Sequence, residues 1–348
     1  MLLKKSARMP KEGITKILIR GTNWIGDAVL TLPAIASVRA AYPQARISIL
    51  AKPLVADVYK LFTAADEIII YKFDNPLGVF RLASILRKKK FDAAILLQNA
   101  IEAAIMVCAA RIKLRGGYNS DGRGFLLTHS IKRTKEIRKV HQIDYYLEMV
   151  KALGCAPVGR EMHLQARINR VIAQNTLHEF IPGPEKPVVG IAPGATYGPA
   201  KRWFPERFAE VADKISANYG CHIVLLGGKD DWKVAQQVCA KSSTDLINLA
   251  GKTTLREAIY LISQCVLFIS NDSGLMHIAG ALNVPTVAIF GSTNPLTTSP
   301  VGEKIKIVRE EVSCSPCLKE TCPTDFRCMD LVKVDDVLSA ARDILKCN

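Results

Sequence analysis

Residues 266–282 read VLFISNDSGLMHIAGAL, and this stretch indicates both a fold class and a kind of ligand. The apolar run 266–269 has the length and β-branched content of a buried strand, and apolar residues return after a polar turn with helical spacing. Asp272 and Ser273 are favoured helix N-cap types, and Gly274 lets a ligand approach the backbone closely. A strand that leads into a helix N-terminus in this way predicts an anion site, typically for phosphate.

His277 lies one helical turn beyond Ser273 and is expected on the same helix face. The turn also has a plainer interpretation, in which Asp272 and Ser273 only cap the helix and His277 is a hydrogen-bonded core residue. The choice between a nucleotide-diphosphate site and a simple helix cap therefore depends on the rest of the chain.

Strand-like runs alternate with helical patterns along the whole chain, which predicts two α/β domains, each with a doubly wound parallel sheet. The expected strands are 17–19, 47–50, 68–71 and 93–97 in the first half, and 188–192, 222–226, 267–270 and 286–290 in the second. The expected helices include 28–41, 79–89 and a final helix, 334–346, which could pack on either domain.

A proline-rich linker, IPGPEKP at 181–187, predicts the boundary between the domains. We expect an N-terminal Rossmann-like domain over 1–180 and a C-terminal one over 181–348. A length of 348 residues suits two such domains.

Ligands of such domains bind at the carboxyl ends of the strands. In the second half the loops expected there are 193–203, 227–231, 271–277 and 290–295. The first half offers GTNWIGD at 21–27, directly after its first strand, which has neither the GxGxxG nor the P-loop pattern. It displays a single carboxylate, Asp27, which either serves chemistry or caps the next helix.

The positive charge of the chain is confined to its first half. Lys and Arg outnumber Asp and Glu by 27 to 12 in residues 1–160, whereas residues 161–348 hold 20 of each. Nine of these cations lie between Arg111 and Lys139. Such asymmetry indicates a polyanionic partner, namely nucleic acid, anionic lipid headgroups or a phosphorylated glycan, unless it only aids solubility.

No stretch reads as a membrane span or a secretory signal, and ten cysteines without a signal peptide indicate a reducing cytoplasm. Four cysteines lie in apolar segments and are expected in the core: Cys108, Cys221, Cys239 and Cys265. Four others form CSPCLKETCPTDFRC, and these either hold a structural metal or remain a reduced loop cluster: Cys314, Cys317, Cys322 and Cys328.

Three motifs together resemble the lipopolysaccharide heptosyltransferases of glycosyltransferase family 9, and the resemblance extends from residue 17 to the final helix. They are GTNWIGDAVLTLPAI, PGATYGPAKRW and SNDSGLMHIAGAL. The form PGATYGPAKRWFPERF and the cysteine-bearing tail are nearer to the type II members of that family. The resemblance implies the GT-B fold, in which two Rossmann-like domains face each other across a cleft. It also implies inverting transfer from ADP-L-glycero-D-manno-heptose, with no cofactor and no catalytic metal.

The family's functional residues carry over motif by motif. Asp27 takes the place of the general base, Lys201 that of a donor-phosphate ligand, and Thr196 that of a hydroxyl near the phosphates. The donor-contacting segment falls on Asp272, Ser273, Gly274 and His277. Lys229 and Asp230 occupy the loop that meets the adenosine, and this is the weakest match.

The implied partners are an ADP-heptose donor and a phosphorylated Kdo–lipid A acceptor, which the basic half would meet at the anionic cytoplasmic face of the inner membrane. The expected location is therefore cytoplasmic and peripheral to that membrane, without nucleic acid. Three other functions remain open: a GT-B transferase that uses another nucleotide sugar, a dinucleotide oxidoreductase, and a basic nucleic-acid-binding protein. The missing GxGxxG disfavours the second, and the lack of a recognition motif disfavours the third.

Overall fold

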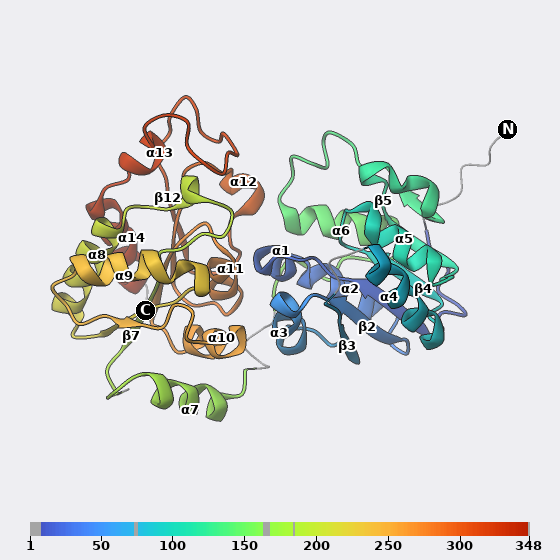
Figure 1. Ribbon diagram of the computed structural model, residues 1–348, viewed down its shortest axis with the longest axis horizontal. Coiled ribbons are helices and arrows are strands. Elements are labelled where there is room, and N and C mark those ends of the chain that lie inside the picture. The colour runs from blue at the N-terminus through green and yellow to red at the C-terminus, as the bar shows by residue number, and fades with distance from the viewer. Residues whose placement is uncertain (1–7, 73–75, 163–167, 184, 347–348) are drawn as a thin grey trace. The chain divides into compact units, whose positions relative to one another are not determined.

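The computed structural model describes residues 8–72, 76–162, 168–183 and 185–346 of the chain (Figure 1). The chain forms two compact units that divide between Glu161 and Met162. The sequence also predicted two domains, but it placed their boundary near residue 180, later than this division. The reason is helix α7 (Arg170–Phe180), which precedes the proline-rich linker yet packs against α10 (Leu255–Ser263) of the second unit.

The first unit is built on one parallel sheet with helices in two layers. Across the sheet the strands are β3 (Glu67–Ile70), β2 (Arg46–Ala51), β1 (Lys16–Arg20), β4 (Ala93–Leu96), β5 (Leu114–Tyr118) and β6 (His129–Ile131). One set of mutually contacting helices comprises α1 (Ile25–Leu30), α2 (Leu32–Ala41), α3 (Pro53–Phe62) and α6 (Gln142–Ala152). The other comprises α4 (Pro76–Lys89) and α5 (Ile101–Ala109).

The four strands expected in the first half are confirmed, because helices on both faces of the sheet require continuous apolar runs such as Ile17 to Ile19. Strands β5 and β6 were not predicted. The sequence of β5, LRGGY, contains an arginine and two glycines, and β6 has only three residues, so neither gives a strand signal.

The helix expected over 28–41 is in fact two helices, α1 and α2, which meet at Thr31. Pro33 explains the break, since proline has no N–H to donate to the carbonyl four residues earlier and its ring collides with that carbonyl. The consequence is that α1 is a short separate element at the carboxyl end of β1, and Asp27 lies in its first turn.

The second unit repeats the same design. Its strands in sheet order are β12 (Ile305–Val308), β11 (Thr286–Ile289), β10 (Leu267–Asn271), β7 (Val188–Ala192), β8 (His222–Leu225) and β9 (Ile247–Asn248). Helix α8 (Pro205–Tyr219) contacts α9 (Trp232–Lys241) and α14 (Val334–Lys346), while α10 contacts α7 and α11 (Gly274–Ala281). The short helices are η1 (Ser120–Leu126) in the first unit and η3 (Pro199–Lys201), η4 (Lys229–Asp231), α12 (Pro295–Thr298) and α13 (Arg327–Asp330) in the second.

The final helix packs on the second unit, which settles the choice that the sequence left open. Val337, Ala341 and Ile344 are buried in one cluster with the strands of that sheet. No helix in the described ranges is long and apolar enough to cross a membrane.

Both sheets reverse their strand order at one point, between β1 and β4 in the first unit and between β7 and β10 in the second. In an open α/β sheet, the loops that leave the carboxyl ends of these two strands diverge to opposite faces and create the usual ligand site. The ligand sites of this fold are therefore expected at the loops after β1, β4, β7 and β10.

Candidate functional site

At the reversal point of the second unit, the loops after β7 and β10 are joined by an ion pair. Lys201 Nζ lies 2.6 Å from Asp272 Oδ2. Thr293, which follows β11, donates its hydroxyl to the same oxygen at 2.6 Å. The side chain of Asp272 is 5% exposed and that of Lys201 is 15% exposed. Two residues predicted from the sequence as donor ligands are thus in contact, and Asp272 fixes the position of the lysine.

Asn271 holds the same two loops together, a role that the sequence analysis missed. Its amide nitrogen donates to the Pro193 carbonyl at 2.7 Å, and its amide oxygen accepts from the Trp203 N–H at 3.0 Å. Both ends of the 193–203 loop are therefore tied to one fully buried side chain. The only signal in the sequence was the position of Asn271 at the end of a strand.

Helix α11 begins next to this ion pair. Ser273 occupies its N-cap position, but neither expected cap forms: the Ser273 hydroxyl meets the Ser270 hydroxyl at 3.0 Å, and Asp272 pairs with Lys201. The amide groups of a first helical turn have no carbonyl within the helix to which they can donate, and the helix dipole adds positive potential there. The N-terminus of α11, with Gly274 as its first residue, is therefore suited to an anion.

His277 lies one turn inside α11, as predicted, and is 5% exposed. Thr196 is exposed in the loop after β7. The next residue, Tyr197, places its ring 4.9 Å from Lys201 Nζ. This cation–aromatic contact and the ion pair with Asp272 together fix the lysine side chain in one orientation.

The loop after β8 contains a buried acid that the sequence analysis did not select. Asp231 is 8% exposed, and its Oδ2 accepts from the Gly228 N–H at 2.9 Å. Its other oxygen, Oδ1, is buried with no hydrogen-bond partner among the described residues. A Cβ atom on Gly194 would lie 2.0 Å from that oxygen, so only glycine fits there. Burial raises the pKa of Asp231, although the Gly228 N–H and the Arg202 charge oppose the rise.

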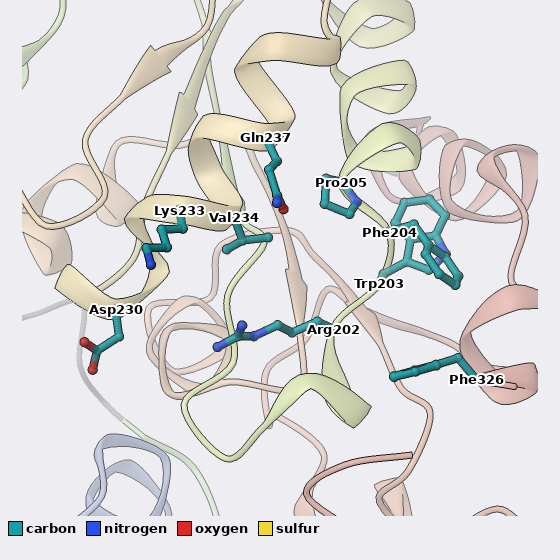
Figure 2. A pocket seen from close by; sticks show the side chains of 9 residues that line it. All are labelled: Arg202, Trp203, Phe204, Pro205, Asp230, Lys233, Val234, Gln237 and Phe326. Carbon is teal, nitrogen blue, oxygen red and sulfur yellow. The ribbon is translucent and has the colours of Figure 1, made fainter. Parts of the chain in front are cut away.

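A cavity of about 340 Å³ lies beside the start of α8 and α9 (Figure 2). Asp230 and Phe326 stand on opposite sides of it, and the Arg202 side chain extends between them. The lining residues are Arg202, Trp203, Phe204, Pro205, Asp230, Lys233, Val234, Gln237 and Phe326. Asp230 lines the cavity and, like Lys229, is exposed; the Lys229 backbone lies against Gly251.

At the reversal point of the first unit, Asp27 is half-buried in the first turn of α1. The preceding loop is held by Arg20, which is 2% exposed and donates to the Gly21 carbonyl, to Asn23 Oδ1 and to the Tyr71 hydroxyl. Gly21 has no side chain because a Cβ would lie 2.7 Å from the Tyr59 ring. The sequence GTNWIGD therefore encodes a rigid loop that presents one carboxylate.

Comparison with known proteins shows the family of the chain. A model of glycosyltransferase family 9 (heptosyltransferase) matches residues 79–326. Lipopolysaccharide heptosyltransferase 2 of Escherichia coli K12 is 30% identical, covering 84% of this chain and 88% of that protein. Lipooligosaccharide heptosyltransferase 2 of Haemophilus influenzae is 31% identical with the same coverage.

The chain belongs to glycosyltransferase family 9, the heptosyltransferases.

A solved structure agrees with this assignment. The ADP-heptose lipopolysaccharide heptosyltransferase II of E. coli superimposes with a TM-score of 0.85 and 28% identity, covering 96% of this chain and 99% of that one. The two Rossmann-like units of this heptosyltransferase are therefore those of the GT-B fold. The sequence left open two other classes of protein, a dinucleotide oxidoreductase and a nucleic-acid-binding protein. Membership of the family shows that the chain is a transferase instead.

The basic segment 111–139 of this heptosyltransferase is not one uniform charged surface. Arg123 is 0% exposed and donates to the backbone carbonyls of Tyr118 and Ala100, so it does not belong to any charged surface. The cations that are exposed are Arg111, Lys113, Lys132, Lys135, Arg138 and Lys139.

The cysteine-rich segment 314–328 lies against the donor loops. Tyr197 donates its hydroxyl to the Leu318 carbonyl at 2.7 Å, and the Leu318 N–H donates to the Ser292 carbonyl at 2.8 Å. Within the described ranges, no three side chains of His, Cys, Asp or Glu are arranged to hold a metal ion. Of the four cysteines expected in the core, Cys221 and Cys265 are buried, while Cys108 and Cys239 are half-buried.

Proposed function

We propose that this family 9 enzyme is an inverting transferase that moves L-glycero-D-manno-heptose from ADP-heptose to the heptosyl/Kdo inner core of lipid A during lipopolysaccharide core biosynthesis. The observation that carries the proposal is the fixed Lys201 beside the N-terminus of α11, at the strand-order reversal of the second unit. Such a site binds a diphosphate through one cation and several amide groups. The heptosyltransferase relatives supply the identity of the sugar.

The donor diphosphate is assigned to Lys201 and to the amide groups at Ser273 and Gly274. Asp272 is a positioning residue in this proposal, because a carboxylate repels phosphate but holds the lysine at 2.6 Å. Thr196 and His277 are assigned to the same phosphates and the adjoining sugar. Asp230 is assigned to the nucleoside together with Lys229, since Asp230 lines the cavity next to the loop after β7.

Asp27 is assigned as the general base. The acceptor hydroxyl oxygen attacks the anomeric carbon from the side opposite the phosphate, and its proton passes to the Asp27 carboxylate. As the new C–O bond forms, the bond from the anomeric carbon to the phosphate oxygen breaks, and ADP leaves with the electron pair. Lys201 and the amides of α11 stabilise the negative charge that develops on ADP. One carboxylate is sufficient, in contrast to the acid and base pair of glycoside hydrolases.

The proposal assigns acceptor activation to the first unit and donor binding to the second. Mutations in the two units should therefore affect separate kinetic constants. The exposed cations of segment 111–139 are assigned to a peripheral contact with the anionic cytoplasmic face of the inner membrane, where the lipid acceptor is embedded.

The test is transfer by the purified full chain. ADP-heptose is offered with Kdo₂-lipid A and, separately, with its mono-heptosylated form, and the released ADP and the mass of the lipid product are measured. We expect one acceptor to gain a single heptose with an equal amount of ADP released. Transfer from a different nucleotide sugar, with none from ADP-heptose to either acceptor, would refute the proposal.

A further inference from the structure

Three arginines of the basic segment are at least half-buried, and two of them serve the fold. Arg115 donates from Nε to the Leu126 carbonyl at 2.7 Å and from Nη1 to the Ile112 carbonyl at 2.5 Å. Arg123 is enclosed and directed at backbone carbonyls, as described above. These two guanidinium groups satisfy carbonyls that would otherwise be unpaired, so they have a structural role.

Arg133 is different, because it is held in place and yet has no acidic partner. Its backbone N–H donates to Asn119 Oδ1 at 2.8 Å, and its guanidinium carbon lies 5.6 Å from the centre of the Tyr145 ring. Its Nε is buried with no hydrogen-bond partner among the described residues. Among the described residues it forms no ion pair with a carboxylate, and its side chain shares a hydrogen bond with the Tyr145 side chain.

The aromatic platform under Arg133 is itself fixed. The Tyr145 hydroxyl donates to Asn99 Oδ1 at 3.0 Å, and the Tyr145 ring lies 4.5 Å from the Tyr118 ring. A guanidinium that is stacked on a rigid ring keeps its planar fork of donors oriented for a carboxylate or a phosphate.

The position of Arg133 relates it to Asp27. It follows β6 at its carboxyl end, the same edge of the sheet at which Asp27 follows β1. Tyr145 belongs to α6, and α6 packs against α1, the helix that carries Asp27. Three strand spacings separate β6 from β1 in the sheet, which is roughly 14 Å at about 4.8 Å per spacing. An anion on Arg133 would therefore belong to a sugar next to the one that receives the heptose.

We propose that Arg133 binds an acidic group, a carboxylate or a phosphate, of the acceptor oligosaccharide beside the sugar that Asp27 activates. The inference rests on the proposed function, and it selects one of nine cations as a specificity residue. The surface cations around it act only through long-range attraction, whereas Arg133 recognises a particular group by directed hydrogen bonds.

The first experiment measures transfer kinetics of Arg133→Gln. A lost charge-assisted contact of about 1.5–3 kcal/mol corresponds to a rise of roughly 10–100-fold in the acceptor KM. The KM for ADP-heptose and the thermal midpoint should match the wild type. Arg133→Lys should recover part of the loss, because it restores the charge without the planar fork. Lys151→Gln, a change at an exposed cation of α6 outside the basic segment, should leave the acceptor KM within about twofold of wild type.

Altered acceptors identify the anion. Two modified acceptors are compared: one without its phosphates, and one in which the carboxylate next to the accepting sugar is reduced to an alcohol. One of these two modifications should raise the acceptor KM of the wild type, and the same modification should leave the acceptor KM of Arg133→Gln unchanged. An acceptor KM of Arg133→Gln within twofold of wild type would overturn the inference. So would equal sensitivity of both proteins to both modifications.

A binding measurement separates this inference from the proposed transfer reaction. Calorimetry without donor compares the wild type with Arg133→Gln, using a delipidated, phosphorylated inner-core oligosaccharide as the probe. We expect the wild type to bind this oligosaccharide and Arg133→Gln to bind it at least tenfold more weakly. This result does not depend on ADP-heptose being the donor. Absence of binding by the wild type, or equal binding by both proteins, would show that Arg133 is not an acceptor site.

Discussion

Replacing Lys201 with methionine should destabilise the chain and weaken ADP binding together. The substitution leaves the Asp272 carboxylate, which is 5% exposed, with the Thr293 hydroxyl as the donor that remains within hydrogen-bond distance. Removing one partner of a buried ion pair costs about 3–5 kcal/mol, and the 15% exposure of Lys201 lets some water reach the carboxylate, so we expect about 2–4 kcal/mol. Loss of a charge-assisted contact to phosphate should also weaken ADP binding by roughly 10–100-fold.

Urea denaturation followed by tryptophan fluorescence measures the first effect, because Trp203 and Trp232 lie in the second unit. The double variant Lys201→Met/Asp272→Asn should recover most of the stability, since it leaves no unpaired buried charge, but it should not recover ADP affinity. Lys214→Met is the matched control: its pair with Glu210 is 2.8 Å long but 45% and 52% exposed, so the loss should be within about 0.5 kcal/mol. Equal stability of Lys201→Met and Lys214→Met, with unchanged ADP affinity, would refute the reasoning.

Two further predictions concern charge. Reversing four exposed cations of the basic segment to Glu (Lys132, Lys135, Arg138 and Lys139) should reduce sedimentation with anionic phospholipid vesicles at least tenfold at low salt and leave ADP affinity unchanged. Equal sedimentation of the variant and the wild type would show that these four cations do not bind the membrane and serve only solubility. Burial alone would raise the pKa of Asp213, but hydrogen bonds from the Ser242 hydroxyl and the Ser243 and Thr244 amides lower it to about 2. Because the folded-state pKa lies below the unfolded value of about 4, this carboxylate stabilises the fold above pH 4 and loses that effect as the pH falls through about 2. Asp213→Asn should therefore show a smaller fall in its urea midpoint between pH 5 and pH 2 than the wild type, and an equal fall would contradict this.

The sequence predicted best those elements whose structure requires a characteristic pattern of residues. Eight strands were predicted because strands covered on both faces need continuous apolar runs, and these are easily read. Lys201 and Asp272 were each predicted as donor ligands from separate motifs, but their contact was not predicted, because β7 and β10 are neighbours only once the sheet order is known. The strands that were missed, such as the two-residue β9, form because a neighbouring strand supplies hydrogen bonds, and this leaves no pattern in the chain.

Polar side chains were harder to assign, because their roles depend on burial. Asp230 and Asp231 are adjacent and equivalent in the sequence, yet one faces a cavity and the other is enclosed against Gly194. The same holds for Arg123 and Arg133, which read alike as members of a basic segment. The fold buries the first among backbone carbonyls and leaves the second stacked on Tyr145 with no acidic partner among the described residues. Only the packing of η1 and α6 distinguishes them.

The role of Asp27 is tested most directly by single-turnover and steady-state transfer by Asp27→Asn, together with calorimetry of ADP. Asparagine has nearly the same shape as aspartate but cannot take the proton, so we expect kcat to fall by roughly 10²–10⁴-fold while ADP affinity stays within about twofold of wild type. Asp121→Asn, at an exposed acid on the loop after β5 in the same unit, should retain normal turnover. Near-normal turnover of Asp27→Asn, or a fall equal to that of Asp121→Asn, would contradict the assignment of Asp27 as the general base.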